Sequence, residues 1–501
     1  MEKIRVYKKE IQFHLLLNIL IATFITFACY IHIPLGDKKG VFMYVVHFIL
    51  LQISIFGFTY LLSLIKKLFL IIFPILFFIN SCLAFWVYTQ DISIDIGMIQ
   101  AITETKLDIA IDTLSWQFIL YILLVLIVIT FTLKYYVKLK RNTVYSPLII
   151  ISIIGVLTFF LVENYSFGAF KRKLPYSSFF SMQSYLSKSD LVLKNVNKNL
   201  KSNEDNLHII FVLGESVRAD HLSLNGYFRE TNPLLSKQKN LISFKNIYTP
   251  LTYTAISVPQ ILTDKSVLDT ANVATSMYSV LNNASFKTEW IGNQSLEKSF
   301  KDIVYTNKTV KIIDQFHSVL SLNKEKDAEL LNNTTLNKKF DGNKITTIHM
   351  IGSHWYYNSR VDENYIKFKP ITSSKYLGSS TTSELINSYD NTILYLDNFL
   401  NSTIETLKKS SKKTILIYLS DHGEILGEDG KWFHAQNHKS SQNPAMLIWF
   451  SEKFKETNED KISKLISKKT DTISTDFLFH SILDLAKIKG YNFRKELSLF
   501  N

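Results

Sequence analysis

The stretch HIIFVLGES, residues 208–216, decides how the second half of this chain folds. Its first seven residues are mostly apolar, and Glu215 and Ser216 follow them directly. A short apolar run bounded by polar residues predicts a strand that is buried on both faces of a sheet. Such a strand would deliver Glu215 and Ser216 to the rim of the sheet, where either one is a candidate functional residue.

The rest of the chain after residue 207 continues this pattern. Helical patterns, such as residues 384–409, lie between further short apolar runs. Strands that alternate with helices predict a mostly parallel sheet with helices on both faces, so we expect residues 207–501 to form an α/β domain. The further predicted strands are TEWIGNQ (288–294), ITTIHMIG (345–352), TILIYLSD (414–421) and AMLIWFS (445–451).

Polar residues stand at the ends of several predicted strands, where sheets of this kind form their sites. Asp421 and His422 follow one strand as Glu215 follows another, and GSH at 352–354 ends a third. Carboxylate oxygens and imidazole nitrogens are ordinary zinc ligands, and the following Gly423 permits close approach of the backbone. Glu215, Asp421 and His422 therefore predict a zinc site with three protein ligands and an open fourth position.

A hydroxyl group is the expected occupant of that fourth position. The stretch YTPLTYTAISVPQ, residues 248–260, carries several hydroxyls, and a hydroxyl beside zinc loses its proton far more easily than in water. The resulting alkoxide would be able to attack phosphorus. The residue pattern alone does not choose among Thr252, Thr254, Ser257 and Ser216.

Five long apolar runs crowd the first third of the chain. Each approaches or exceeds the ~17–25 residues that a helix needs to cross a bilayer. We therefore expect residues 1–163 to form a five-span transmembrane domain. The runs are Ile11–Leu35, Val41–Ile65, Leu68–Tyr88, Trp116–Leu133 and Pro147–Val162.

Basic residues give the orientation of these spans. The N-terminus MEKIRVYKKE, Lys66 with Lys67, and KYYVKLKRN at 134–142 all fall on one side, which is typical of the cytoplasmic face. The odd number of spans then places everything after residue 163 outside. Residues 164–206 combine aromatic and basic residues with a polar end, so they predict a membrane-surface segment and a linker. The long first span predicts an anchor rather than a removed signal peptide.

The composition excludes some classes of protein. Part of the net charge of +13 is the cytoplasmic bias, and the rest lies on a Lys-rich outer domain that is either simply solvated or attracted to anionic lipid headgroups. No nucleic-acid module is recognisable. Both cysteines, Cys29 and Cys82, fall inside predicted spans, so the outer domain has no disulfide and depends on its core for stability.

Several of these segments together resemble the bacterial phosphoethanolamine transferases, membrane enzymes that decorate lipid A and related glycoconjugates. GESVRADHLSLNGYFRETNP (214–233) resembles the signature around the family's metal-ligating glutamate, and TAISVP (254–259) resembles the segment with its threonine nucleophile. SDHGEILGEDGKWFH (420–434) resembles the Asp-His metal segment and a following histidine. HMIGSHWYYNSR (349–360) and WIGNQSLEK (290–298) resemble two further segments of that family.

The resemblance implies a fold and a mechanism. The outer domain would have an alkaline-phosphatase/sulfatase-like fold in the periplasm, below a five-span anchor in the inner membrane. Zinc held by Glu215, Asp421 and His422 would activate Thr254. Thr254 would attack phosphatidylethanolamine, release diacylglycerol and hold phosphoethanolamine covalently until an acceptor takes it. The implied acceptor is lipid A phosphate or core oligosaccharide, and we expect the enzyme to be a monomer.

Further residues receive roles by the same resemblance. His354 and His434 would bind a second zinc ion or the transferring phosphoryl group, or His434 would protonate a leaving oxygen. Substrate contacts are assigned to Lys298, Gln294, His349, Gln100 and Thr105. This chain departs from the family at Ala101, where many members have an asparagine thought to contact the lipid headgroup, and in its lack of disulfides.

Other functions compete with this interpretation. A membrane-anchored sulfatase needs its Cys or Ser followed two residues later by Pro and then Arg, an order that TAISVP lacks. A hydrolase acting as a phosphodiesterase on the same fold, and a glycerophosphate transferase of the lipoteichoic-acid synthase type, remain alternatives. SLNGYFRETNP (223–233) argues against the glycerophosphate transferase. A non-catalytic membrane scaffold would lack the metal and nucleophile residues, which this chain retains.

Five residues near these motifs have simpler predicted roles. We expect Ser216 to cap the following helix. Arg218 is predicted to be a helix-surface or local packing residue. His221 and His480 are predicted structural histidines, and His438 a solvated loop residue.

Overall fold

The structure is a computed structural model that describes residues 2–104, 114–139, 146–165, 170–196, 199–313 and 325–501. The chain divides into two compact units. The first comprises residues 1–100 and 114–188 with 376–378, and the second comprises residues 101–113, 189–375 and 379–501. Each unit is described by itself below.

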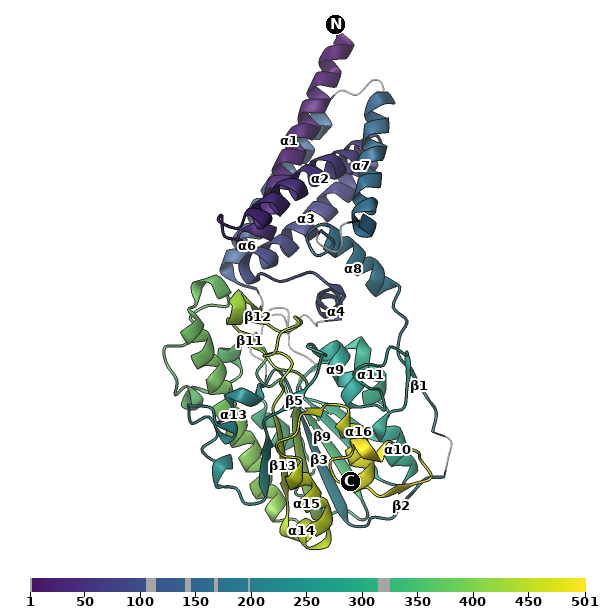
Figure 1. Cartoon of the computed structure of the whole chain (residues 1–501), viewed down its shortest axis with the longest axis vertical. Coiled ribbons are helices and arrows are strands. Elements are labelled where there is room, and N and C mark those ends of the chain that lie inside the picture. The colour runs from purple at the N-terminus through teal and green to yellow at the C-terminus, as the bar shows by residue number, and fades with distance from the viewer. Residues whose placement is uncertain (1, 105–113, 140–145, 166–169, 197–198, 314–324) are drawn as a thin grey trace. The chain divides into compact units, whose positions relative to one another are not determined.

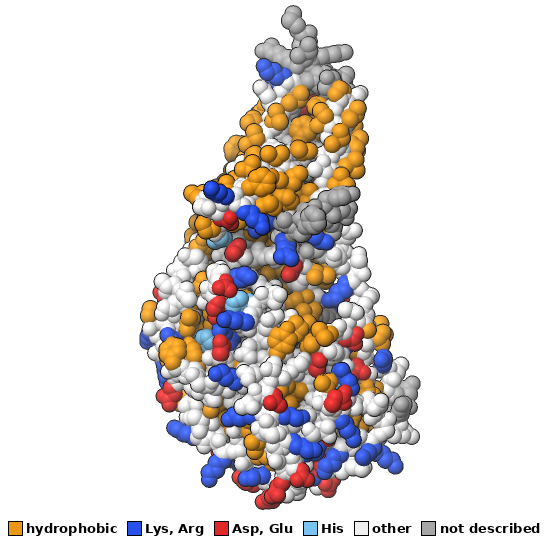
Figure 2. Space-filling view, viewed as in Figure 1, with side chains coloured by type: hydrophobic (Ala, Val, Ile, Leu, Met, Phe, Trp, Pro, Cys, Tyr) orange, Lys and Arg blue, Asp and Glu red, His pale blue; other side chains and the backbone are white. Residues whose placement is uncertain are grey.

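The first unit is a bundle of apolar helices. Among the described residues, four helices (α1, α2, α3 and α6) are long and apolar enough to cross a membrane. The fifth predicted span, α7, is apolar over the shorter stretch Ser146–Val162. Hydrophobic side chains cover the surface of these helices in Figure 2, as expected for contact with lipid rather than water. The helices are α1 (Glu2–Tyr30), α2 (Lys38–Ser63), α3 (Lys66–Gln90), α4 (Ile96–Glu104), α6 (Trp116–Lys138), α7 (Ser146–Tyr165) and α8 (Tyr176–Leu186).

Helices α2 and α7 pack closely because each has a glycine at the contact. A Cβ added to Gly57 would lie 2.4 Å from the carbonyl oxygen of Ser152, and one added to Gly155 would lie 2.4 Å from that of Ile53. Small residues at a contact let two membrane helices approach backbone to backbone, which increases their van der Waals contact. The pair Gly57 and Gly155 therefore holds α7 in the bundle.

Replacing Gly155 by valine should destabilise the first unit. The new side chain cannot fit beside the Ile53 carbonyl, so the helices must separate, at a cost of about 1–3 kcal/mol. The melting temperature of the purified full chain in detergent measures the change. Gly36→Ala is the matched control, since a Cβ there meets no atom within 4 Å. Equal melting temperatures of the Gly155→Val protein and its parent would contradict the proposed role of this glycine contact.

The second unit is built on a seven-stranded sheet with the order β4-β13-β10-β3-β9-β7-β8. The five strands β10, β3, β9, β7 and β8 are parallel to one another. Strand β13 runs antiparallel to both of its neighbours, β10 and β4. The predicted mostly parallel sheet and its five predicted strands are thus confirmed. The strands are β3 (Leu207–Gly214), β4 (Leu241–Phe244), β7 (Lys287–Gly292), β8 (Thr309–Ile312), β9 (Lys344–His349), β10 (Lys413–Ser420) and β13 (Met446–Phe450).

Helices cover both faces of this sheet, which is why its central strands are buried. In Figure 1 the long helix α13 lies on one side, and α9, α10, α11 and α16 lie on the other. All eight residues of β3 are buried, and its odd-numbered side chains share one core with those of α10, α11 and α16. The helices are α9 (Thr254–Ile261), α10 (Met277–Asn283), α11 (Lys298–Val304), α12 (Ala328–Asn333), α13 (Thr382–Lys408), α14 (Glu452–Thr457), α15 (Glu459–Ser467) and α16 (Phe477–Leu485).

Four two-stranded pairs complete the second unit and hold loops against the main sheet. The pair β11 and β12 carries the segment between Asp421 and His434. The pairs are β1 (Val192–Leu193) with β6 (Val273–Ala274), β11 (Ile425–Leu426) with β12 (Trp432–Phe433), β14 (Ile473–Ser474) with β5 (Ile247–Tyr248), and β15 (Ile488–Lys489) with β2 (Lys201–Ser202).

Candidate metal centre and its surroundings

Two neighbouring strands bring three candidate ligands together at one edge of the sheet. Ser420 at the end of β10 pairs with Gly214 at the end of β3, so the residues that follow them meet. His422 Nε2 lies 3.2 Å from Glu215 Oε1 and 3.4 Å from Asp421 Oδ2. All three side chains are buried, and one ligand atom of each lies within 4.8 Å of the others. The structure thus brings together the three residues that the sequence predicts as ligands.

The His422 ring leaves one nitrogen directed at the two carboxylates. Its Nδ1 lies 2.8 Å from the carbonyl oxygen of Gly423, which accepts only, so Nδ1 carries the proton of a neutral ring. Its Nε2 is buried and forms no hydrogen bond with any described residue. A lone pair held toward two carboxylates by a backbone contact is what a metal-binding histidine requires. These residues therefore fit a zinc ion.

The charges of the three groups are strongly linked. Burial and the Glu215 carboxylate raise the pKa of Asp421 to about 7. Burial lowers the pKa of His422, but the Asp421 and Glu215 carboxylates outweigh it and raise that pKa to about 10. Burial opposes ionisation of Glu215, yet the His422 ring holds its pKa well below the usual range. Two carboxylates in this buried space thus demand a positive charge beside them, and a bound cation meets that demand.

Hydroxyl groups and amides fix the two carboxylates. Asp421 accepts from the backbone nitrogens of His422 (2.8 Å) and Ser216 (3.3 Å), and from the Ser257 hydroxyl (3.3 Å). The Ser216 hydroxyl donates to Glu215 Oε1 at 2.9 Å. The prediction that Ser216 caps a helix is wrong. Ser216 has a φ of 59°, and the short 3-10 helix that follows has Arg218 at its N-cap.

Three of the candidate hydroxyls, those of Thr254, Ser216 and Ser257, contact a predicted metal ligand. Thr254 is the first residue of α9, and its hydroxyl donates to Glu215 Oε2 at 2.9 Å. The amino end of a helix carries partial positive charge, which favours an ionised oxygen there. Ser257 lies one turn further along α9 and contacts Asp421 instead. Thr254 differs from Ser216 and Ser257 in its place at the first position of α9 and in its contact with the second oxygen of Glu215.

Two glycines allow the loops of the site to close around the ligands. Gly352 has a φ of +55°, and a Cβ there would lie 2.7 Å from the carbonyl oxygen of Glu215. A Cβ at Gly423 would lie 2.1 Å from the carbonyl oxygen of Ser440. The close backbone approach predicted at Gly423 is therefore confirmed, and a side chain at either position would displace the adjoining ligand.

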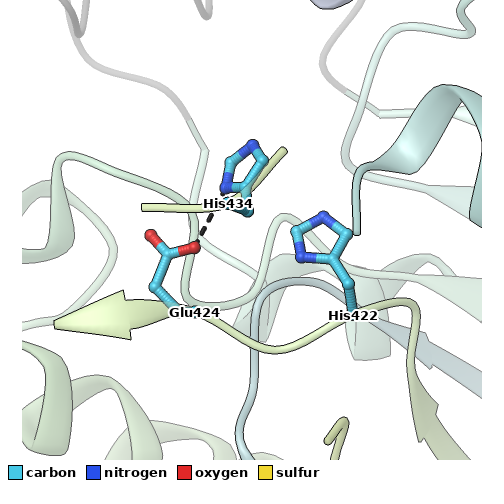
Figure 3. A group of neighbouring side chains, drawn as sticks. All are labelled: His422, Glu424 and His434. Carbon is cyan, nitrogen blue, oxygen red and sulfur yellow. Dashed lines mark hydrogen bonds and ion pairs between the residues drawn. The ribbon is translucent and has the colours of Figure 1, made fainter. Parts of the chain in front are cut away.

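A second group of polar side chains lies beside His422 (Figure 3). His434 Nδ1 lies 2.9 Å from Glu424 Oε2, and the Tyr357 hydroxyl donates to Glu424 Oε1 at 2.9 Å. The Glu424 side chain is fully buried, and the His422 and His434 rings are 4.6 Å apart. Because the carboxylate accepts from Nδ1, the other nitrogen of His434 is left for the site. The sequence pattern predicts no role for Glu424, although this residue stands within SDHGEILGEDGKWFH (420–434).

His354 reaches the same region from the loop after β9. Its ring lies 5.7 Å from that of His434, and its Nδ1 lies 2.7 Å from the Trp355 carbonyl oxygen. Burial lowers the pKa of His354, with the Glu215 carboxylate opposing the shift. The buried Arg360 donates to the carbonyl oxygens of His354 (2.9 Å) and Trp355 (2.7 Å), so it holds this loop. A neutral His354 offers its remaining nitrogen as a ligand or hydrogen-bond acceptor.

The predicted substrate contacts of the second unit differ in exposure. Lys298 begins α11, is exposed, and forms an ion pair with Asp190 at 2.8 Å. Gln294 is buried and donates to the Met350 carbonyl oxygen at 2.7 Å. His349 is buried at the end of β9, with its ring 5.2 Å from that of Trp290. Only Lys298 among these presents its charged group to solvent.

The two remaining predicted contacts belong to the segment around α4. Gln100 is buried, and its Oε1 accepts from the Lys188 amine at 2.8 Å within the first unit. Thr105 lies outside the described residues. Glu104 is buried in the second unit and accepts from the backbone nitrogen of Ser299 at 3.0 Å.

Other histidines and Arg218 take structural positions. His221 is buried and bonded to Asp390 at 2.7 Å, and His480 is buried on α16, as predicted. His438 was predicted to be solvated, which is wrong, because it is buried and its Nδ1 accepts from the Ser440 nitrogen at 3.1 Å. Arg218 is buried too and joins Asp220, Glu428 and the Glu424 carbonyl oxygen, so it is a packing residue.

Comparison with known families covers most of the chain. Residues 208–488 match the sulfatase family, and residues 48–188 match the family described as phosphoethanolamine transferase EptA/EptB. Phosphoethanolamine transferase EptA of Escherichia coli K12 is 33% identical over 301 residues, which are 56% of this chain and 53% of that protein. The chain thus spans about half the length of the curated relatives that it matches.

Solved structures with the same fold include a full-length membrane protein. The integral membrane protein lipooligosaccharide phosphoethanolamine transferase A from Neisseria meningitidis has a TM-score of 0.83 and 22% identity, and the match covers 98% of each chain. The C-terminal periplasmic domain of EcEptC from Escherichia coli, solved in complex with Zn, has a TM-score of 0.53 and 25% identity. That match covers 62% of this chain and 90% of the other.

Proposed function

This chain belongs to the sulfatase family, and from that membership and the EptA/EptB match we propose that it transfers phosphoethanolamine from phosphatidylethanolamine to a lipid A phosphate or core sugar. One observation carries the proposal. The Thr254 hydroxyl lies 2.9 Å from a carboxylate oxygen of Glu215, beside Asp421 and His422. A hydroxyl next to a three-ligand metal group is suited to attack phosphorus.

We propose that Glu215, Asp421, His422 and Thr254 hold one tightly bound zinc ion. Two carboxylates, one imidazole and one hydroxyl form an ordinary zinc donor set. When bound, zinc supplies Lewis-acid charge that favours ionisation of a nearby hydroxyl. His422, Glu424 and His434 also bring ligand atoms within 4.8 Å of one another, which supports a second ion beside His354. However, Glu424 already accepts from Tyr357 and His434, so one ion is the simpler proposal.

The reaction proceeds in two displacements. Thr254 Oγ1 passes its proton to Glu215 Oε2 and forms a bond to the phosphorus of phosphatidylethanolamine, while the bond from phosphorus to the diacylglycerol oxygen breaks. His434 protonates that leaving oxygen, His354 contacts the transferring phosphoryl group, and Lys298 offsets charge on the phosphoryl oxygens. An acceptor oxygen then attacks the phosphothreonine, gives up its proton and restores the Thr254 hydroxyl. Gln294, His349, Gln100 and Thr105 are proposed to contact the two substrates.

The chain is a membrane protein with several apolar helices, and we propose an arrangement in the bacterial inner membrane. The helix α7 would form a fifth span within a domain of residues 1–163, with the N-terminus in the cytoplasm. Residues 164–206 would lie on the membrane surface and lead into the catalytic domain, 207–501, in the periplasm. The four long apolar helices support this arrangement. We propose a monomer that uses lipid substrates and does not bind nucleic acid.

The test uses the purified full chain with phosphatidylethanolamine labelled in its headgroup and with lipid A. We expect labelled phosphoethanolamine on lipid A and release of diacylglycerol, measured by mass spectrometry. Transfer from phosphatidylglycerol instead would indicate the glycerophosphate transferase. Release of free phosphoethanolamine without any labelled acceptor would indicate the hydrolase.

Replacement of Glu424 by glutamine should slow the reaction without removing the metal. The amide keeps the size of the side chain but withdraws the negative charge that orients and polarises His434. Loss of a residue that hydrogen-bonds to a histidine of a metal site typically lowers metal affinity or activity by about 10–100-fold. We therefore expect kcat to fall about tenfold or more. Zinc content per chain should stay at the parental value. Tyr357→Phe, which removes only one hydrogen bond to Glu424, should have a smaller effect. An unchanged kcat in Glu424→Gln would exclude this role.

A further inference from the structure

A polar cavity lies within the first unit, apart from every residue assigned to catalysis. Its volume is about 370 Å³, within the range of small-molecule sites. Its walls come from the ends of α1 and α3, the segment after α3 and the residues that lead into α8. The lining residues are Cys29, Val87, Asp91, Ile92, Ser93, Ile94, Arg172, Lys173, Leu174 and Ser177.

One side of this cavity is positively charged and rich in donors. Arg172 is exposed at the cavity, and the Lys173 amine donates one hydrogen bond to the Cys29 carbonyl oxygen at 3.0 Å. Lys173 also lies over the Tyr30 ring at 5.0 Å, which fixes the direction of its amine. The same side includes the first turn of α8, whose helix end carries partial positive charge. This side suits a phosphate oxygen.

A buried hydroxyl in the same wall indicates a missing partner. Ser177 is 3% exposed and lines the cavity, but its hydroxyl has no hydrogen-bond partner among the described residues. Proteins seldom leave a buried hydroxyl without a hydrogen-bond partner, because the loss of its contacts with water is then not compensated. Because Ser177 stands in the wall with Arg172 and Lys173, a phosphate oxygen between them would accept from all three side chains.

The lining of the cavity also carries negative charge. Asp91 is the C-cap of α3 and lines the cavity together with Val87 of that helix. The cavity also meets the end of α1 at Cys29, and the carboxyl end of a helix carries partial negative charge. A carboxylate and two helix ends of this kind suit an ammonium group. The exposed apolar rings of Phe27 and Tyr88 adjoin these residues in the chain, where acyl chains would leave the site.

We propose that this cavity binds the zwitterionic headgroup of a phospholipid, with the phosphate against Arg172, Lys173 and Ser177 and the ammonium against Asp91. The inference rests on the proposed function only in naming phosphatidylethanolamine as the lipid. The cavity would hold the donor lipid within the first unit, on residues that include neither the zinc ligands nor Thr254. Phosphatidylglycerol has a neutral glycerol in place of the ammonium, so it would lose the attraction of Asp91 and the two helix ends.

The test uses the full chain with Thr254→Ala in dodecyl maltoside, so that bound lipid is not consumed. The probe is a phosphatidylethanolamine with a photoreactive diazirine near its glycerol, and labelled peptides are identified by mass spectrometry. We expect labelling of residues 87–94 and 170–177. Unlabelled phosphatidylethanolamine should compete at least about tenfold better than phosphatidylglycerol or inorganic phosphate, the size of one lost charged contact.

Variants of the cavity decide the assignment of its residues. Arg172→Gln and Ser177→Ala should each reduce labelling of these peptides, by about tenfold and about threefold respectively. Asp91→Asn should remove the preference for phosphatidylethanolamine over phosphatidylglycerol. Lys171→Gln is the matched control, because it removes a neighbouring exposed charge that does not line the cavity, and it should label as the parent does.

Either of two results would overturn the inference: undiminished labelling in Arg172→Gln, or equal competition by phosphatidylglycerol. The outcome is independent of the proposed transfer reaction, since labelling requires no turnover. A chain that labels as expected but transfers nothing would disprove the proposed function and leave this site standing. A chain that transfers phosphoethanolamine at the parental rate, but whose cavity is not labelled, would disprove only the site.

Discussion

Thr254→Ala protein should transfer no measurable phosphoethanolamine, a loss of about ten-thousand-fold or more in kcat, because the covalent intermediate then has no oxygen to form on. Thr254 is the first residue of α9, and no other described hydroxyl contacts Glu215 Oε2. Removing one hydroxyl should leave the fold intact, so the variant should keep its parental melting temperature within a few degrees. Incubation of the parent with headgroup-labelled phosphatidylethanolamine, followed by peptide mapping, should place the label on Thr254.

Neighbouring hydroxyls provide the controls for this result. Ser257 lies on the same helix and contacts Asp421, so Ser257→Ala should reduce the rate but still form the labelled intermediate. Thr254→Ser keeps the hydroxyl and should retain part of the activity. Full activity in Thr254→Ala, or label on Ser257 in the parent, would disprove the assignment of Thr254 as the nucleophile.

Glu215→Ala should lose its zinc. Residues that hydrogen-bond to metal ligands typically contribute about 10–100-fold to metal affinity. Loss of a direct ligand should therefore lower zinc affinity by at least about a hundredfold. Elemental analysis of the purified full chain after dialysis should find about one zinc ion in the parent and a small fraction of that in the variant. Loss of transfer activity should accompany the loss of metal. A metal-free parent with full activity would be inconsistent with the whole mechanism.

Two further substitutions calibrate the zinc measurement. Ser216→Ala removes only the hydroxyl that donates to Glu215 Oε1, so its zinc affinity should fall by about tenfold. Asp397→Asn changes a buried carboxylate on α13 that accepts from the backbone nitrogens of Leu234 and Leu235. That residue has no contact with the metal group, and its zinc content should match the parent. Equal zinc loss in all three variants would indicate general unfolding instead of ligand removal.

Much of the second unit was predictable because its signals are local. Strands buried on both faces are mostly short apolar runs bounded by polar residues, so β3, β7, β9, β10 and β13 could be read from the local sequence pattern. The polar residues that follow β3 and β10 stand out against those runs for the same reason. Family membership, inferred from several ordered motifs, was confirmed by the match of residues 208–488.

The wrong predictions concern residues whose surroundings come from distant parts of the chain. Ser216 looked like a helix cap, but no helix of the expected kind follows it, and its hydroxyl turns to Glu215. His438 stands in a polar stretch, yet the Asp429 carboxylate and the Ser440 amide enclose it. Neither the loop path nor the burial of a single polar residue is encoded by periodicity.

The sequence by itself determined the strands, the apolar helices and the identity of three metal-ligand candidates, because each depends on residue type within a few neighbours. The tertiary structure showed that Thr254, Ser257 and Ser216 each contact a predicted ligand, and that Thr254 and Ser216 reach different oxygens of Glu215. It also brought Glu424 to His434, ten residues further along the chain, and lined one cavity with both Asp91 and Lys173. These contacts depend on the path of the loops and on packing, which residue type within a few neighbours does not specify.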